Sequence, residues 1–394
     1  MVFYRRLFPV VKNVCPFLLP TQAANLALLI GAILSKRSLC LTTLAKAFPI
    51  PVERQVDNPK HELQHRLKRL SRFLSNDYFD AVQVQLAFIP TVIAQLGYPR
   101  WLALAIDWTK FEVNLPGIAG GGKRKYQVLT ISIPRRGRAL PLLSVTYDSE
   151  KLPARGSQNL WEQEALEVVL QALPLGVRPL VIGDRGFGRA EFIIWLKDRH
   201  VDYVLRVKRG TTITEADGRQ WKLGEEGLRP GQRRWVSSVR FATYHDRPRD
   251  LVINLACSWR WPKRPRRQKK GKEYKEPWYL ATSLGSLGSA VAWYRERMWL
   301  EETFKDFHSE FGLEDVQIGK AGRLGRLVGA LSLAVAWLHL LALARTGVLP
   351  SNWAASVVTH GRASLVSLAL AYLDYLGDFP PRALKLLRTK PRAA

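Results

Sequence analysis

Pro179-Leu-Val-Ile-Gly183-Asp184 is a short apolar run that ends in a glycine and an acid. A run of this length between turn-forming residues is typical of a strand that is buried on both faces. The flanking sequence predicts further strands over 102–107, 127–134, 140–147 and 201–207, and helices over 159–173 and 189–200. Three successive strands followed by crossover units predict a mixed sheet with helices on its faces.

This order of elements is that of a ribonuclease-H-like core, and the predicted fold class is α/β. A polar stretch over 209–277, with short strand candidates and a basic loop at 258–276, interrupts that core. We predict five parts: a helical region over 1–95, the first core part over 96–208, a β-rich insertion over 209–277, the second core part over 278–318, and a helical C-terminal region over 319–394.

The charge of the chain favours a polyanionic partner. Sixty Lys and Arg residues against 33 Asp and Glu give a formal net charge of +27, which attracts nucleic acid or an anionic membrane. The stretch 59–74 has the spacing of an amphipathic helix with a basic polar face. A solvated face without a partner is the alternative, but we expect this helix to contact DNA phosphates through Arg66, Lys68, Arg69 and Arg72.

Cysteine usage and hydropathy bear on the compartment. Cys15, Cys40 and Cys257 are odd in number and far apart, so they form neither a disulfide framework nor a set of metal ligands. The segment 327–344 has no formal charge and just reaches the length of a bilayer span. Because it contains His339 and several small residues, a buried helix is the preferred interpretation. We expect a cytoplasmic protein with no membrane partner.

Two acids follow predicted strands of the sheet. Asp107 ends the apolar run 102–107, and Asp184 ends the run quoted above. Open α/β sheets build their sites at such strand ends. For Asp184, a turn that caps the next helix is the alternative.

A third acid lies on a helix predicted over 293–311. Its apolar positions 293, 300, 304, 307 and 311 form one stripe, and a polar stripe runs beside it. Glu301 then lies at the edge of the buried face, whereas Glu302 points to solvent. Ordinary ion pairs of Glu301 with residues one turn away are the alternative. The polar stripe comprises Tyr294, Arg297, Glu301, Lys305 and His308.

Carboxylates that are brought together repel one another unless a cation lies between them. Oxygen ligands suit Mg²⁺, for which Mn²⁺ can substitute, and two such ions about 4 Å apart can promote phosphoryl transfer. Arg297 is suited to hold a phosphate through two hydrogen bonds, and Lys305 and His308 to make single contacts. Tyr294 is expected either to bond a phosphate or to fix the helix.

Three motifs resemble the DDE transposases of bacterial insertion sequences. They are Asp107-Trp108-Thr109, Gly183-Asp184-Arg185-Gly186-Phe187, and the helix segment 294–305. The resemblance is to the group with the signature Tyr, two residues, Arg, three residues, Glu, six residues, Lys. Tyr294, Arg297 and Glu301 fit this spacing, but His308 stands at the position of the Lys. The resemblance covers about 100–318.

The resemblance implies a transposase with Asp107, Asp184 and Glu301 as catalytic residues and metal ligands. It also implies binding of terminal inverted repeats by the N-terminal helices, a homodimer in the synaptic complex, and cleavage and transfer of strands of double-stranded DNA into a target. The expected location is the nucleoid of a bacterium. A nuclease of the same fold and a non-catalytic DNA-binding regulator are the alternatives.

Two further DNA contacts are expected with less support from the pattern. The stretch Gly117–Arg124 is close to the sequence of a phosphate-binding loop, but it lacks the Ser or Thr that binds Mg²⁺ in such a loop. We interpret it as a hairpin loop that touches DNA through Lys123 and Arg124. In relatives, an aromatic residue of the insertion stacks on a flipped base. Trp278 is the candidate for that role, with a core tryptophan as the alternative.

Overall fold

The structure is a computed structural model, and it describes residues 2–49, 59–115, 122–135, 137–152, 157–241, 251–260, 276–345, 366 and 369–370. The chain forms two compact units. Unit 1 comprises residues 1–100, 108–177 and 299–394, and unit 2 comprises 101–107 and 178–298. The basic part of the predicted loop at 261–275, most of the Gly117–Arg124 loop and most of the chain after 345 lie outside the described residues.

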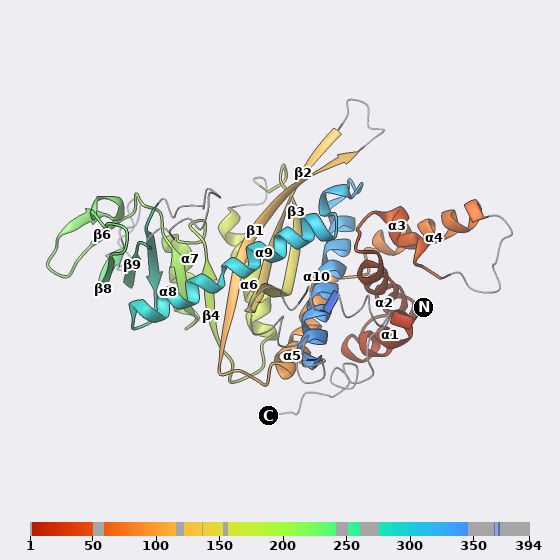
Figure 1. The fold of residues 1–394 in the computed structure, drawn as a ribbon, viewed down its shortest axis with the longest axis horizontal. Helices are drawn as coiled ribbons and strands as arrows, with labels where there is room; N and C mark the ends of the chain where they lie inside the picture. The colour runs from red at the N-terminus through yellow and green to blue at the C-terminus, as the bar shows by residue number, and fades with distance from the viewer. Residues whose placement is uncertain are drawn as a thin grey trace, which may run out of the picture. The chain divides into compact units, whose positions relative to one another are not determined.

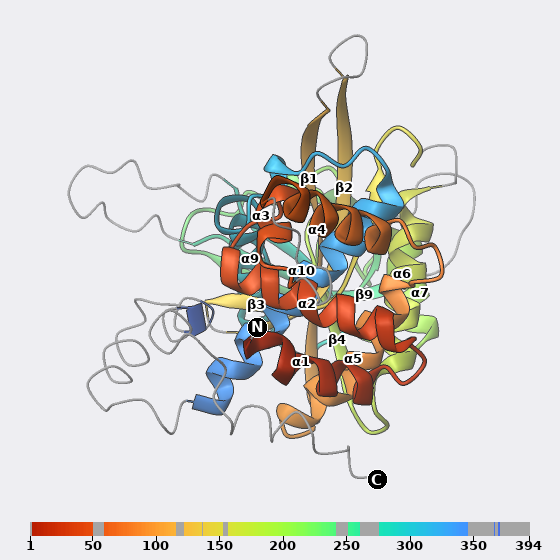
Figure 2. The same ribbon diagram turned by 90° about the vertical axis from the view of Figure 1, so that its right-hand side faces the viewer.

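Unit 1 begins with five helices, as the helical pattern over 1–95 predicted. They are α1 (Val2–Val14), α2 (Pro20–Lys36), α3 (Leu41–Lys46), α4 (Pro59–Leu74) and α5 (Ala81–Gln95). Figure 2 shows α1 to α4 together on one side of this unit. The start of α5 is capped by Asp80, whose carboxylate accepts hydrogen bonds from the backbone N–H groups of Val82 and Gln83.

The sheet of unit 1 contains the antiparallel strands β2 (Gly122–Arg135) and β3 (Arg138–Asp148), next to the second part of β1 (Trp101–Leu115). Helix α6 (Gln158–Ala172) packs against β2 and β3, and α10 (Ala321–Arg345) packs against β3, α2 and α5 (Figure 1). Buried polar groups join these layers. The hydroxyl of Ser332 of α10 donates to the hydroxyl of Ser144 of β3, and the side-chain amide of Gln85 of α5 bonds the backbone N–H and carbonyl oxygen of Ser144.

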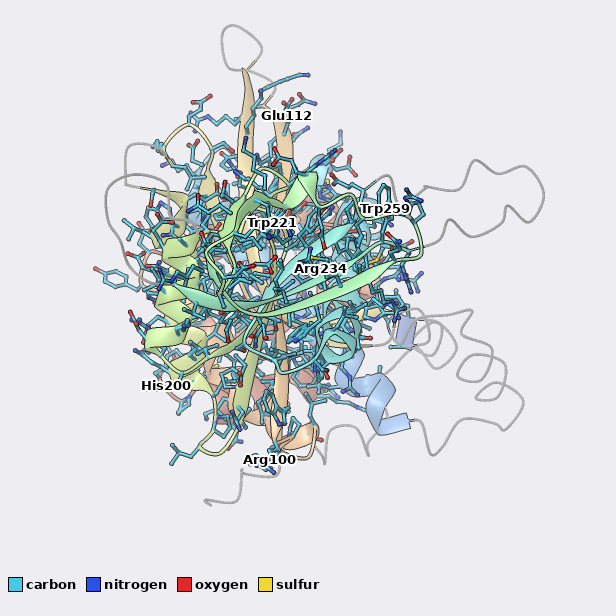
Figure 3. All side chains as sticks on the ribbon, turned by 90° about the vertical axis from the view of Figure 1, so that its left-hand side faces the viewer. Arg100, Glu112, His200, Trp221, Arg234 and Trp259 are labelled. Carbon is cyan, nitrogen blue, oxygen red and sulfur yellow. The ribbon has the colours of Figure 1, made fainter. Side chains whose placement is uncertain are left out.

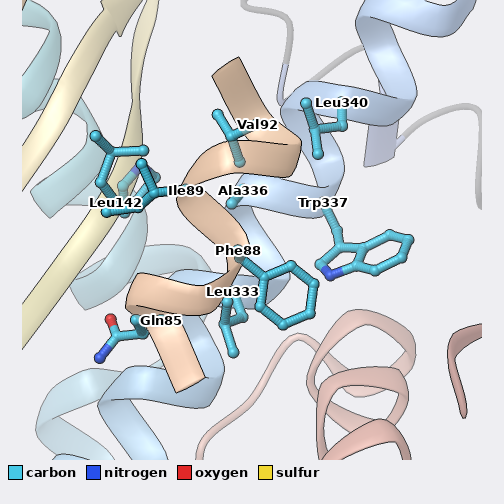
Figure 4. A pocket seen from close by; sticks show the side chains of 10 residues that line it. Gln85, Phe88, Ile89, Val92, Leu142, Leu333, Ala336, Trp337 and Leu340 are labelled. Carbon is cyan, nitrogen blue, oxygen red and sulfur yellow. The ribbon is translucent and has the colours of Figure 1, made fainter. Parts of the chain in front are cut away.

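Helix α10 is the core helix of unit 1. Among the described residues, one stretch, Ala321–Leu341, is long and apolar enough to cross a membrane, and 89% of its apolar window is buried inside the molecule. Figure 4 shows Trp337, Leu333 and Leu340 of α10 beside Phe88 and Val92 of α5, where they line an apolar cavity of only about 10 Å³. This close packing is what the preferred interpretation of 327–344 predicted.

Unit 2 is built on the first seven residues of β1 and on β4 (Arg178–Gly183) and β5 (Asp202–Arg206), which are parallel to one another. The strands after β5 are antiparallel. They are β6 (Thr212–Thr214), β7 (Gln220–Lys222), β8 (Arg233–Phe241), β9 (Val252–Ser258) and β10 (Trp278–Thr282). The strand order is β3-β2-β1-β4-β5-β10-β9-β8-β6-β7, so the predicted mixed sheet is confirmed.

One arginine links three other residues of the β-rich insertion. Arg234 of β8 lies over the ring of Trp221 of β7, with its guanidinium carbon 5.0 Å from the ring centroid (Figure 3). The same guanidinium bonds Glu215 at 2.9 Å and the buried Glu226 at 3.4 Å. Helices α7 (Ala190–Asp198) and α8 (Leu287–Glu296) pack on β5 in this unit.

Two predicted boundaries were wrong. Strand β1 does not end at Asp107 but continues to Leu115. Residues 102–106 are all buried, whereas burial alternates from 109 to 114, so the apolar run ends where one face of the strand becomes exposed. The helix predicted over 293–311 is also interrupted. Helix α8 ends at Glu296, α9 covers Met298–Lys305, and a π-helical turn follows over Asp306–Glu310.

Candidate active site

Asp107 and Asp184 emerge at neighbouring positions of unit 2. Strands β1 and β4 are parallel, and Ile106 is paired with Gly183 at the end of the paired segment. Asp107 is the next residue of β1, and Asp184 directly follows the last residue of β4. Adjacent strands lie about 4.8 Å apart, and residues opposite one another share a face of the sheet. The structure therefore brings these two predicted site residues to one edge of the β1–β4 pair.

Asp107 already has a cationic partner in unit 2. Arg297, which follows α8, donates from Nη1 to Oδ2 of Asp107 at 2.9 Å. Both side chains are largely buried, with 11% of Arg297 and 15% of Asp107 exposed. The contact is thus a charge-assisted hydrogen bond in a partly desolvated place. Arg297 was expected to hold a phosphate, and here it binds a carboxylate.

Tyr294 and Trp278 are core residues. Tyr294 is 3% exposed and Trp278 is 7% exposed, and their rings meet edge to face with centroids 4.9 Å apart. Both belong to the hydrophobic core of unit 2. Burial raises the pKa of Tyr294. Of the two expected roles of Tyr294, fixing the helix agrees with this position. For Trp278 the core alternative holds, because a base could not stack on it without displacing its neighbours.

Asp184 begins a tight turn that glycines make possible. Its Oδ1 accepts a hydrogen bond from the N–H of Gly186 at 2.7 Å. A Cβ on Gly188 would lie 2.2 Å from the carbonyl oxygen of Arg206, so this position has no room for a side chain. The turn was the alternative considered for Asp184. Because the carboxylate of Asp184 makes this hydrogen bond from the end of β4, Asp184 can form the turn and also bind a metal ion.

An unpredicted ion cluster lies beside this turn. Glu276 accepts hydrogen bonds at Oε1 from Arg185 at 2.8 Å and from Arg206 at 2.7 Å. The sequence pattern did not indicate it, because Glu276 closes a polar loop about 70 and 90 residues away from its partners in the chain. Two guanidinium groups therefore stand near the strand ends of unit 2, with one carboxylate between them.

Glu301 and Glu302 lie on α9 in unit 1, and both side chains are partly exposed. The expectation that Glu302 points away to solvent was wrong. Glu302 is 34% exposed, pairs with Lys305, and lies 4.0 Å from Nη1 of Arg138. Lys305, one of the predicted DNA contacts, is exposed but takes Glu302 as its partner.

His308 lies in the π-helical turn and contacts the second part of β1. Its Nε2 is 2.9 Å from Oγ1 of Thr109, and its Nδ1 is 3.0 Å from Oε1 of Glu314. The ring also meets Phe111 edge to face. Both ring nitrogens therefore have protein partners, which disagrees with the predicted role of His308 as a phosphate contact.

The four predicted DNA contacts of α4 divide into two pairs. Arg66 pairs with Glu62 and donates to the carbonyl oxygen of Lys46, and Arg69 donates to Asn25 Oδ1 at 2.9 Å. Burial lowers the pKa of Arg69. These two arginines connect α4 to its neighbouring helices in this structure, and their role as phosphate contacts stays a prediction. Lys68 and Arg72 are exposed, as a DNA contact requires.

The remaining predicted contacts lie where β1 and β2 extend past β3 (Figure 1). Lys123 is 68% exposed and lies 3.8 Å from Glu112, whereas Arg124 donates to the carbonyl oxygen of Gly319. An open groove of about 860 Å³ runs along this part of unit 1, and its lining includes Lys110, Lys123 and Lys125 as well as Glu112, Glu314 and Asp315. Its charges are balanced, so the groove is not a basic one.

The donor set of unit 2 fits a hard divalent cation. Asp107 and Asp184 supply carboxylate oxygens at adjacent strand positions, and the charge of Asp107 is compensated by Arg297. Within the described ranges, no cluster of three or more His, Cys, Asp or Glu side chains is close enough to hold a metal. The three cysteines are free, and burial raises the pKa of Cys15 to about 12.

Comparison with known proteins agrees with this geometry. The family model of the transposase DDE domain matches residues 102–334, which is more than half of the chain. The match begins at β1 and ends within α10, so it includes Asp107, Asp184 and Glu301. No curated protein gives a significant match to the sequence. With its ribonuclease-H-like mixed sheet and this match, the chain belongs to the transposase DDE domain family.

Proposed function

We propose that this protein binds the terminal inverted repeats of a mobile element, cuts DNA strands at the element ends, and joins them to target DNA. One observation carries the proposal. In a chain of the transposase DDE family, Asp107 and Asp184 directly follow the paired residues Ile106 and Gly183 of two parallel strands. Carboxylates at such adjacent positions of parallel strands are suited to metal-dependent phosphoryl transfer.

Asp107, Asp184 and Glu301 are the proposed ligands of Mg²⁺, in two sites, with Mn²⁺ as a substitute. When bound, such ions activate a water or a 3′-hydroxyl and stabilise the leaving oxygen. Glu301 belongs to unit 1, but it follows Arg297, the partner of Asp107, by only four residues. Four residues are about one helical turn. This short spacing supports Glu301 as the third ligand.

Arg297 has two uses in this proposal. In the structure it neutralises Asp107, and guanidinium groups bind phosphate with the same geometry as carboxylate. Once the charge of Asp107 is compensated in another way, Arg297 can exchange this carboxylate for a DNA phosphate near the cut. The group would then hold the substrate strand in line with the attacking oxygen.

The exposed cations Lys68, Arg72, Lys123 and Lys305 are proposed to contact DNA phosphates. The net charge of +27 supports this, because phosphate neutralisation contributes most of the non-specific affinity of such proteins. We further propose a homodimer that brings two element ends together. Since DNA is the substrate, the expected location is the nucleoid in a bacterial cytoplasm.

The test uses the full chain, a duplex with the flanking terminal repeat, and Mg²⁺. Asp107→Asn, Asp184→Asn and Glu301→Gln should each reduce cleavage below detection while binding of the ends is retained. Each substitution removes a charged ligand but keeps the shape of the side chain. The matched control is Glu302→Gln on the same helix, because its partly exposed pair with Lys305 contributes little.

The outcomes separate the candidate functions. Cleavage that survives in one of the three variants removes that residue from the site. A regulator would bind the repeats and leave them intact in the wild type. A nuclease would cut the DNA, but no product would contain the element end joined to a target.

A further inference from the structure

The helix that carries Glu301 is fixed to the start of β3 by two polar residues. Oγ1 of Thr303 accepts a hydrogen bond from the N–H of Ala139 at 2.8 Å and lies 3.1 Å from the carbonyl oxygen of Ala139. Asp306 takes two hydrogen bonds from Arg138, at Oδ2 from Nε and at Oδ1 from Nη2, with the latter at 2.9 Å. All of these residues belong to unit 1.

The contact of Thr303 is buried, and that of Asp306 with Arg138 is partly buried. Thr303 is 0% exposed, and the side chains of Asp306 and Arg138 are 8% and 21% exposed. Strand β3 comes first in the strand order, so Ala139 lies on an edge strand, whose outward backbone groups need a partner. Thr303 supplies one. Arg138 is itself held, because its Nη1 donates to the carbonyl oxygen of Gly137 at 2.7 Å.

The contacts lie on the side of the helix away from Glu301. Successive residues of an α-helix are about 100° apart, which places Thr303 about 200° and Asp306 about 140° from Glu301. Asp306 is also the first residue of the π-helical turn, where its carbonyl oxygen accepts from the N–H of Phe311 at 3.1 Å. The rotation of α9 about its own axis is thus set from the face opposite to Glu301.

From this arrangement we infer that Arg138, Thr303 and Asp306 form a clamp that fixes the direction of the carboxylate of Glu301, the proposed third ion ligand. They are positioning residues, since none of them touches the reacting atoms. The inference rests on the proposed function, because it takes Glu301 to be an ion ligand. Residues that hydrogen-bond a metal ligand and orient it contribute about 10- to 100-fold to metal affinity or activity, and we expect an effect of this size from the clamp.

The experiment measures Mn²⁺ binding to the full chain by electron paramagnetic resonance and the rate of cleavage of bound DNA ends. Asp306→Asn and Thr303→Val should each weaken Mn²⁺ binding, and slow cleavage, by about 10- to 100-fold. Binding of the ends should be unchanged. Hydrogen exchange across residues 298–311 should become faster in both variants, because α9 loses its anchor.

Arg326→Lys is the matched control. Arg326 is 11% exposed and binds the carbonyl oxygens of Leu74 and Phe79 as well as Asp77, but it has no part in the clamp. This variant should lose thermal stability and bind Mn²⁺ like the wild type. Should Asp306→Asn fail to fold, Thr303→Val decides, since it removes one hydroxyl and keeps the shape.

The result that overturns the clamp is a folded Asp306→Asn or Thr303→Val variant with the Mn²⁺ affinity of the wild type. Weaker Mn²⁺ binding in Arg326→Lys of the same size would also overturn it, because the effect would then be general destabilisation. If the wild type neither binds Mn²⁺ nor cuts DNA, the proposed function fails together with the clamp. If the wild type is active and the clamp variants behave like it, the clamp is wrong and the proposed function stands.

Discussion

His308 is held at both of its ring nitrogens, by Thr109 and by Glu314. A side chain that contacts a DNA phosphate releases counterions, and each such contact adds about 0.9 to the slope of log affinity against log salt. We therefore expect His308→Ala to leave this slope unchanged when the affinity for end DNA is measured over a series of salt concentrations. A slope that falls by about one unit would show that His308 leaves its partners for a phosphate.

For single residues, the sequence indicated which side chains are candidates for the site, but it did not indicate their hydrogen-bond partners. The spacing of Asp107, Asp184 and Glu301 was visible because each acid follows or flanks an apolar pattern. The partner of Arg297 was not visible, because Asp107 lies 190 residues earlier in the chain. The Arg138–Asp306 pair was missed for the same reason, at a separation of 168 residues. Single sequences carry no signal for such pairs.

Helix α4 shows how one amphipathic element divides its basic residues between packing and surface. Arg69 bonds Asn25 and lies 6.0 Å from the ring of Phe48, whereas Lys68 and Arg72 are exposed. Arg69→Ala should lower the free energy of unfolding by about 2 kcal/mol, because a hydrogen bond from a charged, partly buried donor is lost. Urea unfolding of the purified chain measures this change.

The exposed pair of α4 provides the complementary prediction. The double variant Lys68→Ala and Arg72→Ala should reduce the salt slope of DNA binding by about two units. Its unfolding midpoint should stay that of the wild type, since neither side chain is buried. The prediction is wrong if the slope is unchanged, in which case the basic face of α4 is only solvated.

The elements that were predicted incorrectly share a physical cause. The apolar run that ends at Asp107 marks where one face of β1 becomes exposed, and the strand itself continues to Leu115. Likewise, the apolar stripe over 293–311 serves two cores. Trp293 packs in unit 2, whereas Leu300, Phe304 and Phe307 are buried in unit 1. The spacing of apolar residues indicates which face of a helix or strand is buried. It does not indicate where one hydrophobic core ends and the next begins.

For the molecule as a whole, the order of strands and helices was enough to predict a mixed sheet. Crossover connections restrict parallel strands to a few arrangements, and in the structure β4 lies between the parallel strands β1 and β5. The insertion did not follow such a rule. Its strands were expected from composition, but the sequence did not show that β8, β9 and β10 extend the same sheet. Antiparallel additions at a sheet edge have no comparable constraint on their order.

Stability against acid depends on a histidine in the core of unit 1. His339 of α10 is 0% exposed, and its Nδ1 lies 2.9 Å from the carbonyl oxygen of Val335. Burial lowers the pKa of His339 from 6.5 to about 4, and the charges of Arg135 and Arg138 act in the same direction. Because the folded pKa lies below the unfolded one, the unfolded chain takes up a proton first as the pH falls. The neutral histidine therefore supports the fold fully above pH 6.5, and this contribution is lost as the pH falls toward about 4.

The corresponding experiment compares the wild type with His339→Leu, which fills a similar volume and does not titrate. At about 1.4 kcal/mol for each unit of pKa, the wild type should lose about 3 kcal/mol more than the variant between pH 6.5 and 4. Urea unfolding at a series of pH values measures the difference, and carboxylate titrations cancel because both proteins share them. Parallel stability curves would mean that His339 becomes protonated without unfolding the core. Buried water reaching its Nε2, which has no hydrogen-bond partner among the residues that the structure describes, would then be the physical explanation to test.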